Sequence, residues 1–288
     1  MTVKQKRRRV VFISGTSSGI GKACAIDLAR HGYRVFAGVR SEAAGYRLTA
    51  RMPQQITPIE LDITKAGDIR AAAASIDRLL GQGEGLDVIV NNAGITVPGA
   101  VECVALEDVR RQLEVNVIGH VALTQALLPL LRRTRGRIIN IGSIMGRFVM
   151  PLSGPYAMSK FAMRAINDAW RRELRPWGID VVLIEPGSVE SAIWDKIDSE
   201  AAQYKGKLNA AARDRYANIE ASLVATWKRA HRMAIPADTV ARAIRRSIEK
   251  KRPKPHLFVG PDAHGLALVS RFLPDSCLDW MIGKITGR

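Results

Sequence analysis

Short apolar runs alternate along the chain with longer amphipathic stretches, at a spacing of roughly 20–30 residues that is typical of βαβ units. The apolar runs predict strands at residues 10–13, 33–39, 56–61, 86–90, 137–141, 180–184 and 256–259. The stretches between them predict helices at 19–31, from the end of the second strand through 51, and at 66–80, 106–133, 155–177 and 237–250. Residues 190–233 are polar, with a helical but irregular pattern.

The predicted strands are almost continuously apolar and do not alternate between apolar and polar residues. Strands of this kind are buried on both faces, so the pattern predicts a parallel sheet with helices on both sides. The expected fold class is α/β, a doubly wound Rossmann-type sheet of about seven strands. A chain of 288 residues without internal repeats or a low-complexity linker fits a single domain over residues 1–288. Such sheets bind ligands at the carboxyl ends of their strands.

The turn after the first predicted strand is rich in glycine, in the spacing Gly-x-x-x-Gly-x-Gly. Glycine permits a tight turn and lets a pyrophosphate approach the backbone without a clash at Cβ. The helix that begins here would offer free N–H groups and a partial positive charge. An ordinary glycine-rich turn is the alternative, but the strand–turn–helix context favours a dinucleotide. The residues expected to hold it are Gly15, Ser17, Ser18, Gly19, Ile20 and Gly21.

The second predicted strand ends at Val39, and Arg40 follows it. An acidic residue at this point would accept hydrogen bonds from the ribose 2′-hydroxyl of NAD, whereas an arginine pairs with the 2′-phosphate of NADP. Arg40 therefore favours NADP(H) as the cofactor and leaves NAD(H) open. The alternative is that Arg40 is a solvent-exposed residue beside a pocket that recognises the adenosine by other groups.

Tyr156 is the one tyrosine of the five in the chain that has a lysine four residues later, at Lys160. On the predicted helix the two side chains share a face, one turn apart. A nearby ammonium group lowers the pKa of a tyrosine and suits it to proton transfer near neutral pH. Ser143 follows the fifth predicted strand, at a separation that lets it converge on the same point. A surface pair at i, i+4 is the alternative for Tyr156 and Lys160.

The order and spacing of these motifs, from about residue 8 to residue 187, resemble the short-chain dehydrogenase/reductase family. The Val-Phe-Ala-Gly-Val-Arg segment and the long stretch 190–233 look like its steroid and retinol dehydrogenase branch. The resemblance implies an oxidoreductase in which Ser143 binds the substrate oxygen and Tyr156 is the general acid or base. Lys160 would lower the pKa of Tyr156 and bind the nicotinamide ribose. Asn116 would hold a water that links Lys160 to solvent.

The same resemblance implies further cofactor contacts, each after a predicted strand. Asp62 would lie near the adenine ring, although a single aspartate equally fits a cap of the following helix. The segment that would line the cofactor site after the fourth strand is Asn92, Ala93 and Gly94. The contacts expected on the nicotinamide side are Pro186, Gly187, Val189 and Ser191. The family usually has threonine where this chain has Ser14 and Ser191.

Residues 190–233 occupy the place of the family's variable substrate lid, and residues 263–288 form a C-terminal extension. The apolar and aromatic residues expected near the substrate are Met145, Phe148, Val149, Met150, Ile193, Trp194, Ile197, Tyr204, Leu208 and Tyr216. They favour a bulky hydrophobic alcohol or ketone, such as a steroid, a retinoid or a lipid-derived carbonyl; packing of the lid alone is the alternative. The extension has two apolar clusters split by Pro274. We interpret it as a segment that closes the substrate pocket or contacts another subunit, in preference to one that contacts a membrane. The family implies a homodimer or homotetramer.

Composition changes this picture in few respects. The net charge of +17 raises nucleic acid or an anionic membrane as partners, but the arginines are scattered, so no nucleic-acid partner is expected. Three cysteines without metal-like spacing predict neither a disulfide nor a metal site. No signal-like segment precedes the first strand and no uninterrupted apolar stretch of about 18 residues occurs, so we expect a cytoplasmic protein. A non-catalytic NADP(H)-binding sensor or scaffold on the same fold is the alternative function.

Overall fold

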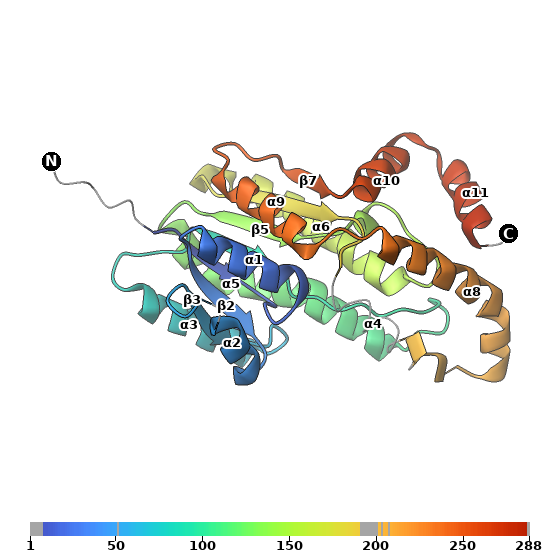
Figure 1. Ribbon diagram of the computed structural model, residues 1–288, viewed down its shortest axis with the longest axis horizontal. Coiled ribbons are helices and arrows are strands. Elements are labelled where there is room, and N and C mark those ends of the chain that lie inside the picture. Colours follow the sequence, from blue (N-terminus) through green and yellow to red (C-terminus); the bar gives the residue numbers. More distant parts are fainter. Residues whose placement is uncertain (1–7, 51, 191–200, 203, 207, 287–288) are drawn as a thin grey trace.

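The computed structural model describes residues 8–50, 52–190, 201–202, 204–206 and 208–286. They form one α/β domain in which helices cover both faces of a central sheet, as Figure 1 shows. The sheet has seven strands in the order β3-β2-β1-β4-β5-β6-β7, and every neighbouring pair is parallel. The doubly wound parallel sheet predicted from the apolar runs is confirmed.

The strands are β1 (Val10–Ile13), β2 (Arg34–Val39), β3 (Ile56–Glu60), β4 (Val88–Asn91), β5 (Arg137–Ile141), β6 (Asp180–Pro186) and β7 (His256–Val259). Alternate residues of β1 enter different hydrophobic cores: Val11 and Ile13 lie on one face of the sheet, Val10 and Phe12 on the other. This double burial explains why the strand is apolar at every position. The strand order reverses between β1 and β4, which places a ligand-binding crevice at their carboxyl ends.

Two sets of helices enclose the sheet. One face carries α1 (Gly19–Arg30), α2 (Glu42–Thr49) and α9 (Ala237–Glu249), with α1 and α9 packed side by side (Figure 1). The other face carries α3 (Ala66–Leu80), α5 (Gly119–Arg132) and α6 (Gly154–Glu173), and α4 (Leu106–Leu113) extends from α5 toward the carboxyl ends of the strands. Both cores are therefore closed by amphipathic helices, as the sequence pattern predicts.

The helix predicted over 106–133 contains an interruption. Between α4 and α5, the residues of η1 (Glu114–Ile118) form a π-helix, a wider turn that is often found at functional sites. The stretch Leu106–Arg132 is the one helix in the described ranges with the length and composition of a membrane span, and 44% of its most apolar window is buried inside the protein. Leu123, Leu127 and Leu131 of this stretch are fully buried in the core beside the sheet. A core helix can have the same length and apolar composition as a membrane span.

The helix predicted over 155–177 ends earlier, at Glu173, and a 3₁₀ turn (η3, Arg175–Trp177) follows. Pro176 has no N–H to continue the α-helical ladder, which accounts for the change. In the C-terminal third, α8 (Ala210–Arg232), α10 (Pro261–Phe272) and α11 (Asp275–Thr286) gather at the end toward which β7 points (Figure 1). Pro274 separates α10 from α11, and α11 packs against α8.

Candidate active site

The glycine-rich turn joins β1 to α1 through a backbone that favours glycine. Gly15 and Gly19 have φ values of +69° and +55°, in the left-handed region. A Cβ on Gly21 would clash with the Gly15 carbonyl oxygen and with the Asn92 amide, so no side chain fits there. Ser18 is exposed at the N-terminus of α1, where the first N–H groups have no partner within the helix. These features fit a cofactor pyrophosphate bound to backbone N–H groups.

The end of β4 is bonded directly to the glycine turn. Asn92 Nδ2 donates to the carbonyl oxygens of Ser14 (2.9 Å) and Gly15 (3.0 Å). The Ser14 hydroxyl accepts hydrogen bonds from the N–H groups of Asn92 (2.9 Å) and Ala93 (3.1 Å). The structure therefore brings together the two predicted cofactor segments, residues 15–21 and residues 92–94. The Ser14 hydroxyl joins them, and a serine provides this hydroxyl as well as the threonine that the family usually has.

Arg40 lies just beyond β2, whose residue Gly38 accepts a hydrogen bond from Thr16 N–H of the glycine turn (3.0 Å). The Arg40 side chain is exposed and forms no ion pair within the part of the chain described. A cation near a pyrophosphate site that forms no ion pair with the described acidic residues suits a bound 2′-phosphate.

Asp62 lies beyond β3 and binds its own loop. Its Oδ1 accepts hydrogen bonds from the Thr64 N–H (3.0 Å) and the Thr64 hydroxyl (2.8 Å). The Thr64 backbone bond above all holds the pKa of Asp62 below its usual value, with a smaller contribution from Arg40. Because α3 begins at Ala66 with Lys65 as its N-cap, the interpretation of Asp62 as a helix cap is wrong.

Ser143, Tyr156 and Lys160 converge at the carboxyl end of β5. Ser143 begins the 3₁₀ turn η2 (Ile144–Gly146), and its hydroxyl accepts the Met145 N–H (3.1 Å). The same hydroxyl lies near the Tyr156 phenol and acts to lower its pKa. Lys160 Nζ donates to the Ile141 carbonyl oxygen (2.9 Å) and lies 5.5 Å from the centroid of the Tyr156 ring. The serine, tyrosine and lysine predicted to act together are thus neighbours.

The pKa of Tyr156 departs from the sequence-based expectation. Burial raises it, and the Ser143 hydroxyl offsets only part of that rise. Lys160, whose ammonium lies over the ring face and donates to Ile141, does not reverse this direction, and the expected lowering of the Tyr156 pKa by Lys160 stays a prediction. The phenol is therefore protonated at neutral pH. Burial lowers the pKa of Lys160 itself to about 8.

Asn116 occupies the centre of the π-helix and is 1% exposed. Its Nδ2 donates to the Ile95 carbonyl oxygen (3.0 Å) and to Ser159 Oγ (3.1 Å), while its Oδ1 accepts the Ile95 N–H (2.9 Å). An amide that is ill-placed in an apolar helix pattern is therefore fully bonded. It links the segment after β4 to α6, one residue before Lys160.

Three buried polar residues of this region were not singled out from the sequence. Gln112 is fully buried and bonds Val97 N–H (2.7 Å) and the Ile95 carbonyl oxygen (2.9 Å). His120 is 2% exposed, and burial, aided by the charge of Lys160, lowers its pKa to about 3. Further along α5, Thr124 accepts a hydrogen bond from Asn91 Nδ2 (2.9 Å). A polar residue inside an otherwise apolar helix run is the sequence signal that would have indicated His120 and Thr124, whereas Gln112 stands in a mostly polar run that gives no such signal.

The turn after β6 is bonded on two sides. Gly187 N–H donates to the Val259 carbonyl oxygen (3.0 Å), and Ser188 N–H donates to Asp262 Oδ2 (2.7 Å). A Cβ on Gly187 would clash with the Asp262 carboxylate, so any other residue there would displace the group that binds the Ser188 N–H. Asp262, at the start of α10, therefore fixes the turn that contains Gly187 and Val189. Ser191 lies outside the described residues.

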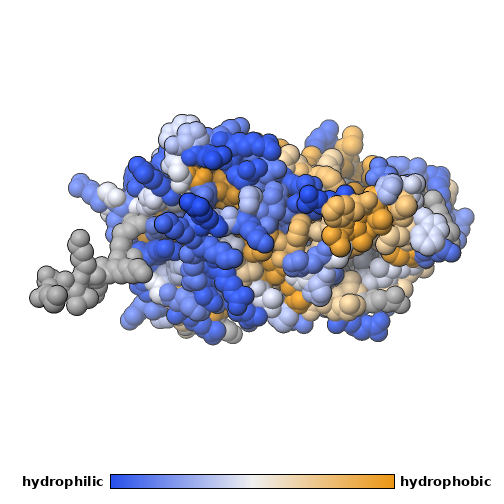
Figure 2. Space-filling model, turned by 90° about the horizontal axis from the view of Figure 1, so that it is seen from above, coloured by the Kyte–Doolittle hydropathy of each residue, from blue (hydrophilic) through white to orange (hydrophobic). Residues whose placement is uncertain are grey.

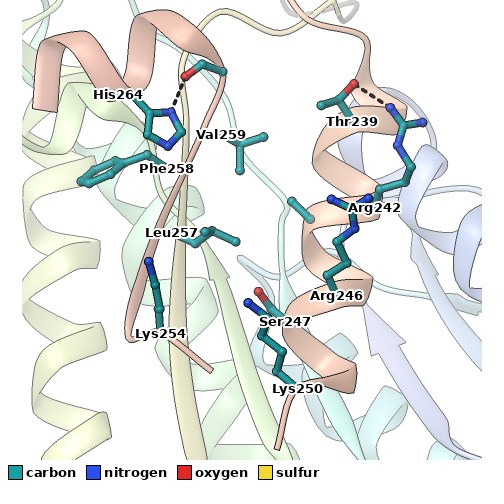
Figure 3. Close-up of a pocket in the computed structure, with 12 residues that line it drawn as sticks. Thr239, Arg242, Arg246, Ser247, Lys250, Lys254, Leu257, Phe258, Val259 and His264 are labelled. Carbon is teal, nitrogen blue, oxygen red and sulfur yellow. Dashed lines mark hydrogen bonds between the residues drawn. The ribbon is translucent and has the colours of Figure 1, made fainter. Parts of the chain in front are cut away.

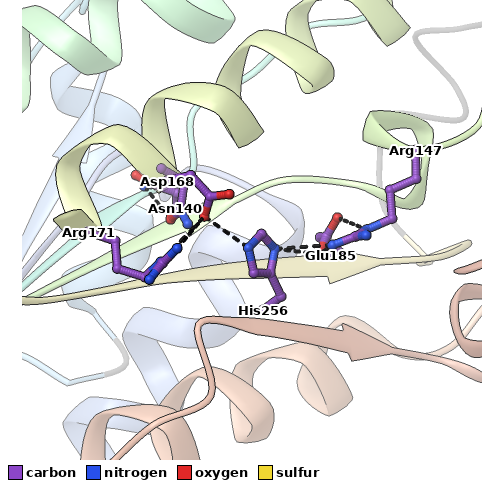
Figure 4. A network of polar contacts seen from close by, with 7 residues as sticks. Asn140, Arg147, Asp168, Arg171, Glu185 and His256 are labelled. Atoms are coloured by element: carbon purple, nitrogen blue, oxygen red, sulfur yellow. Dashed lines mark hydrogen bonds and ion pairs between the residues drawn. The ribbon is translucent and has the colours of Figure 1, made fainter. Parts of the chain in front are cut away.

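A network of ionic and hydrogen-bonded side chains joins Arg147, Glu185, His256 and Asp168 (Figure 4). Arg147, one residue past η2, donates twice to the fully buried Glu185 carboxylate, at 2.7 and 3.0 Å. His256 lies between Glu185 and Asp168, with its ring nitrogens 3.1 Å from each carboxylate. Burial raises the pKa of Glu185, but hydrogen bonds from His256 and Arg147 outweigh it and hold that pKa below its usual value. The network joins the serine loop to β6, β7 and α6.

Arg147→Met is expected to lower the free energy of unfolding by about 2 kcal/mol, because it leaves a buried carboxylate with one partner fewer. Urea unfolding at pH 7 measures the change. Adding Glu185→Gln should recover part of the loss, since the neutral amide no longer needs a cation. Equal unfolding free energies for the wild type and Arg147→Met would contradict the role given to this pair.

Lys160→Met is expected to stabilise the fold while it abolishes turnover. The pKa of Lys160 is about 8 in the folded chain and about 10.4 for an unfolded lysine, so the unfolded state binds more protons between those values. The buried ammonium therefore costs stability below pH 8, and this cost fades as the pH rises. Unfolding at pH 7 should show a gain on the order of 1–3 kcal/mol for the variant, which shrinks toward pH 10. A gain that is the same at both pH values would rule out this origin.

Comparisons with known proteins agree with this geometry. A family model described as short chain dehydrogenase matches residues 9–202. The NADPH-dependent 3-dehydrocapnine reductase of Ornithobacterium rhinotracheale is 34% identical over 281 residues, which cover 96% of each chain. Retinol dehydrogenase 5 of Mus musculus is 30% identical over 95% of this chain and 89% of its own. A short-chain dehydrogenase structure from Streptomyces avermitilis superposes with a TM-score of 0.76 at 26% identity, covering 98% of this chain and 96% of its own. The chain therefore belongs to the short-chain dehydrogenase family of NAD(P)-dependent oxidoreductases, near its retinol dehydrogenases.

Proposed function

We propose that this protein reduces the carbonyl group of a bulky hydrophobic substrate, with NADPH as the hydride donor. The observation that carries the proposal is the convergence of Ser143, Tyr156 and Lys160, in a buried setting that raises the pKa of the Tyr156 phenol and keeps it protonated at neutral pH. A protonated group is the form that a proton donor needs during reduction. The name of the relative from Ornithobacterium rhinotracheale, an NADPH-dependent reductase that matches over nearly the whole chain, supports both the direction and the cofactor.

In the proposed reaction the substrate oxygen accepts hydrogen bonds from Ser143 and Tyr156. Tyr156 donates its proton to that oxygen, and a bound NADPH would supply the hydride that the carbonyl carbon needs. The Lys160 ammonium, 5.5 Å from the ring centroid, stabilises the phenolate that remains. Asn116 positions this pair through Ser159, whose hydroxyl donates to the Tyr156 carbonyl oxygen (2.7 Å). These residues thus position or stabilise the groups between which the Tyr156 proton moves.

For cofactor binding, we propose that the pyrophosphate lies against the N-terminus of α1 and the 2′-phosphate pairs with Arg40. The exposed Ser18 and the φ values of Gly15 and Gly19 support the first contact. The lack of an acidic partner for Arg40 in the described ranges supports the second. Lys160 would bind the nicotinamide ribose. The nicotinamide carboxamide would meet the turn from Pro186 to Val189 and the hydroxyl of Ser191.

For the substrate, we propose a pocket between the segment after Ser143 and the lid region. Tyr204 folds onto the segment after β4: its hydroxyl accepts the Ala100 N–H (2.9 Å), and burial raises the pKa of its phenol to about 12. Leu208 is 8% exposed, so part of the lid region packs inward. Val149, after the catalytic serine, is 47% exposed and offers apolar surface. This lining favours a steroid-, retinoid- or lipid-like carbonyl over a small polar one.

The direct test is to incubate the purified protein with NADPH or NADH and a panel of hydrophobic ketones and aldehydes, and to follow the loss of nicotinamide absorbance. We expect turnover with NADPH and at least one bulky ketone, and slower turnover with NADH. Binding of NADPH without turnover of any carbonyl or alcohol would favour a sensor or scaffold. Faster turnover with small polar ketones would overturn the substrate class alone.

The rate of reduction is expected to fall above about pH 8, where Lys160 loses its proton. Without the ammonium, the phenolate formed when Tyr156 gives up its proton is less stable. Lys160→Arg keeps its charge at every accessible pH, so the fall should move to higher pH even if the variant is slower. A pH profile of kcat for both proteins tests this. Descending limbs at the same pH would assign the titration to another group.

A further inference from the structure

A hollow of about 500 Å³ lies between α9, β7 and the start of α10, separate from the residues of the candidate active site. Its lining includes five cationic or titratable basic side chains: Arg242, Arg246, Lys250, Lys254 and His264. We call it the basic pocket. All its lining residues lie between Thr239 and His264, so one stretch that runs from α9 through β7 into α10 forms it.

The basic side chains enter from opposite walls (Figure 3). Arg242 and Arg246 are spaced four residues apart and so share one face of α9, and Lys250 follows directly after the helix ends. Lys254 and His264 face them from the β7 and α10 side. The floor includes apolar side chains of β7, such as Leu257, which keep the base of the hollow free of competing charge. Positive charge therefore converges on one concave space.

No described residue that lines the basic pocket is acidic. Arg242 makes one hydrogen bond, to the Thr239 hydroxyl (2.9 Å), and neither Arg246 nor Lys250 forms an ion pair within the described ranges. The adjacent Arg245 shows the contrast: it is paired with Asp27 (2.8 Å) and with Glu249 (3.4 Å). Arg245 therefore has acidic partners, whereas Arg242 and Arg246 of the basic pocket have none within the described ranges.

Uncompensated like charges gathered in a hollow repel one another, and a bound anion removes that repulsion. Guanidinium groups offer several donors in a fork that matches phosphate, and lysines add point charges. Hydroxyls of Thr239 and Ser247 in the same lining supply further polar contacts. We propose that the basic pocket binds a multiply charged phosphate-type oxyanion, at a site distinct from the cofactor's.

The oxyanion has two chemical sources, a soluble phosphate compound or the headgroup of an anionic lipid. The helix α10 continues from His264 with Leu268 and Phe272 on the same face, and these are 63% and 69% exposed. Figure 2 shows hydrophobic surface on the half of the molecule that holds α10, next to hydrophilic surface over α9. An acyl chain beside the pocket would find this surface, so the test includes both sources.

The experiment uses the full chain in the presence of saturating NADP⁺, so that phosphate binding at the cofactor site does not contribute. Sodium diphosphate is titrated into the protein by calorimetry at constant ionic strength. In a parallel arm, the protein is sedimented with phosphatidylcholine vesicles that contain phosphatidic acid. Both arms compare the wild type with the pair Arg242→Ala/Arg246→Ala and with a control pair, Arg70→Ala/Arg78→Ala. The control removes the same charge from α3, which covers the opposite face of the sheet.

We expect saturable binding by the wild type and the control pair in at least one arm, weakened at least about tenfold in the pocket pair. Binding of diphosphate would identify a soluble ligand, and binding of vesicles alone would identify a lipid headgroup. Two results would overturn the proposal: no saturable binding in either arm, or the same loss in both variant pairs, which would reflect net charge alone. Thermal melts of all variants confirm that each is folded.

Discussion

Tyr156→Phe should lower kcat for carbonyl reduction by about 10³-fold, within the range that a positioned general acid contributes. The substitution removes one hydroxyl and keeps the ring that lies under Lys160 Nζ, so packing and the Lys160 bond to Ile141 are retained. The affinity for NADPH should therefore change little. Steady-state kinetics with the best ketone of the panel, together with a fluorescence titration of NADPH, measures the two quantities separately.

Tyr46→Phe is the matched control, because it removes the same hydroxyl from a residue that is 75% exposed on α2. It should leave kcat unchanged. If Tyr156→Phe retains wild-type turnover, Tyr156 is not the proton donor, and the raised pKa of its phenol has no catalytic meaning. If both turnover and NADPH affinity collapse, the tyrosine supports the site as a whole, and its role in proton transfer is not established.

Arg40→Asp should reverse the cofactor preference. In the wild type, a guanidinium without an acidic partner in the described chain would form charge-assisted hydrogen bonds with the 2′-phosphate, each worth about 1.5–3 kcal/mol. The aspartate loses these bonds, repels the phosphate and accepts hydrogen bonds from the ribose hydroxyls of NADH. The ratio of kcat/KM for NADPH to that for NADH should fall by about 10²–10³.

Arg47→Asp makes the same change of charge at an exposed position of α2 and serves as the control. It should reduce NADPH binding only through the general field of the protein, an effect that added salt screens. Equal losses for NADPH and NADH in Arg40→Asp would mean that Arg40 does not read the phosphate. The adenosine would then be recognised by other groups near the ends of β2 and β3.

The parts of the fold that depend on local pattern were predictable from the sequence. Strands at 137–141 and 256–259 and the helix at 66–80 occur with the predicted bounds, because continuous apolar runs and amphipathic periods identify them without tertiary information. The glycine turn and the converging Ser143, Tyr156 and Lys160 also follow from spacing within a parallel sheet. The glycine turn and Ser143 lie directly after strands, where the fold class places ligand sites, and Tyr156 and Lys160 lie on the next helix, α6.

What the sequence did not reveal depends on partners distant in the chain. Asp262 acts on Ser188 across 74 positions, and Glu185 meets Arg147 across 38. The pKa of Tyr156 could not be anticipated either, since spacing places Lys160 on the same helix face but does not say that its ammonium binds Ile141. Burial of the phenol, a property of the assembled site, decides the direction of that shift.

The π-helix at Glu114–Ile118 makes the length of this segment matter as much as its residues. A π-helical turn contains one residue more than an α-helical turn, and each α-helical residue rotates the chain by about 100°. Asn116 at its centre must reach Ile95, while Thr124 beyond it must reach Asn91. Deleting a single residue between them would restore a regular helix and turn one of these side chains away from its partner. Among related sequences, insertions and deletions in this segment should therefore be rarer than substitutions of the exposed Ile118.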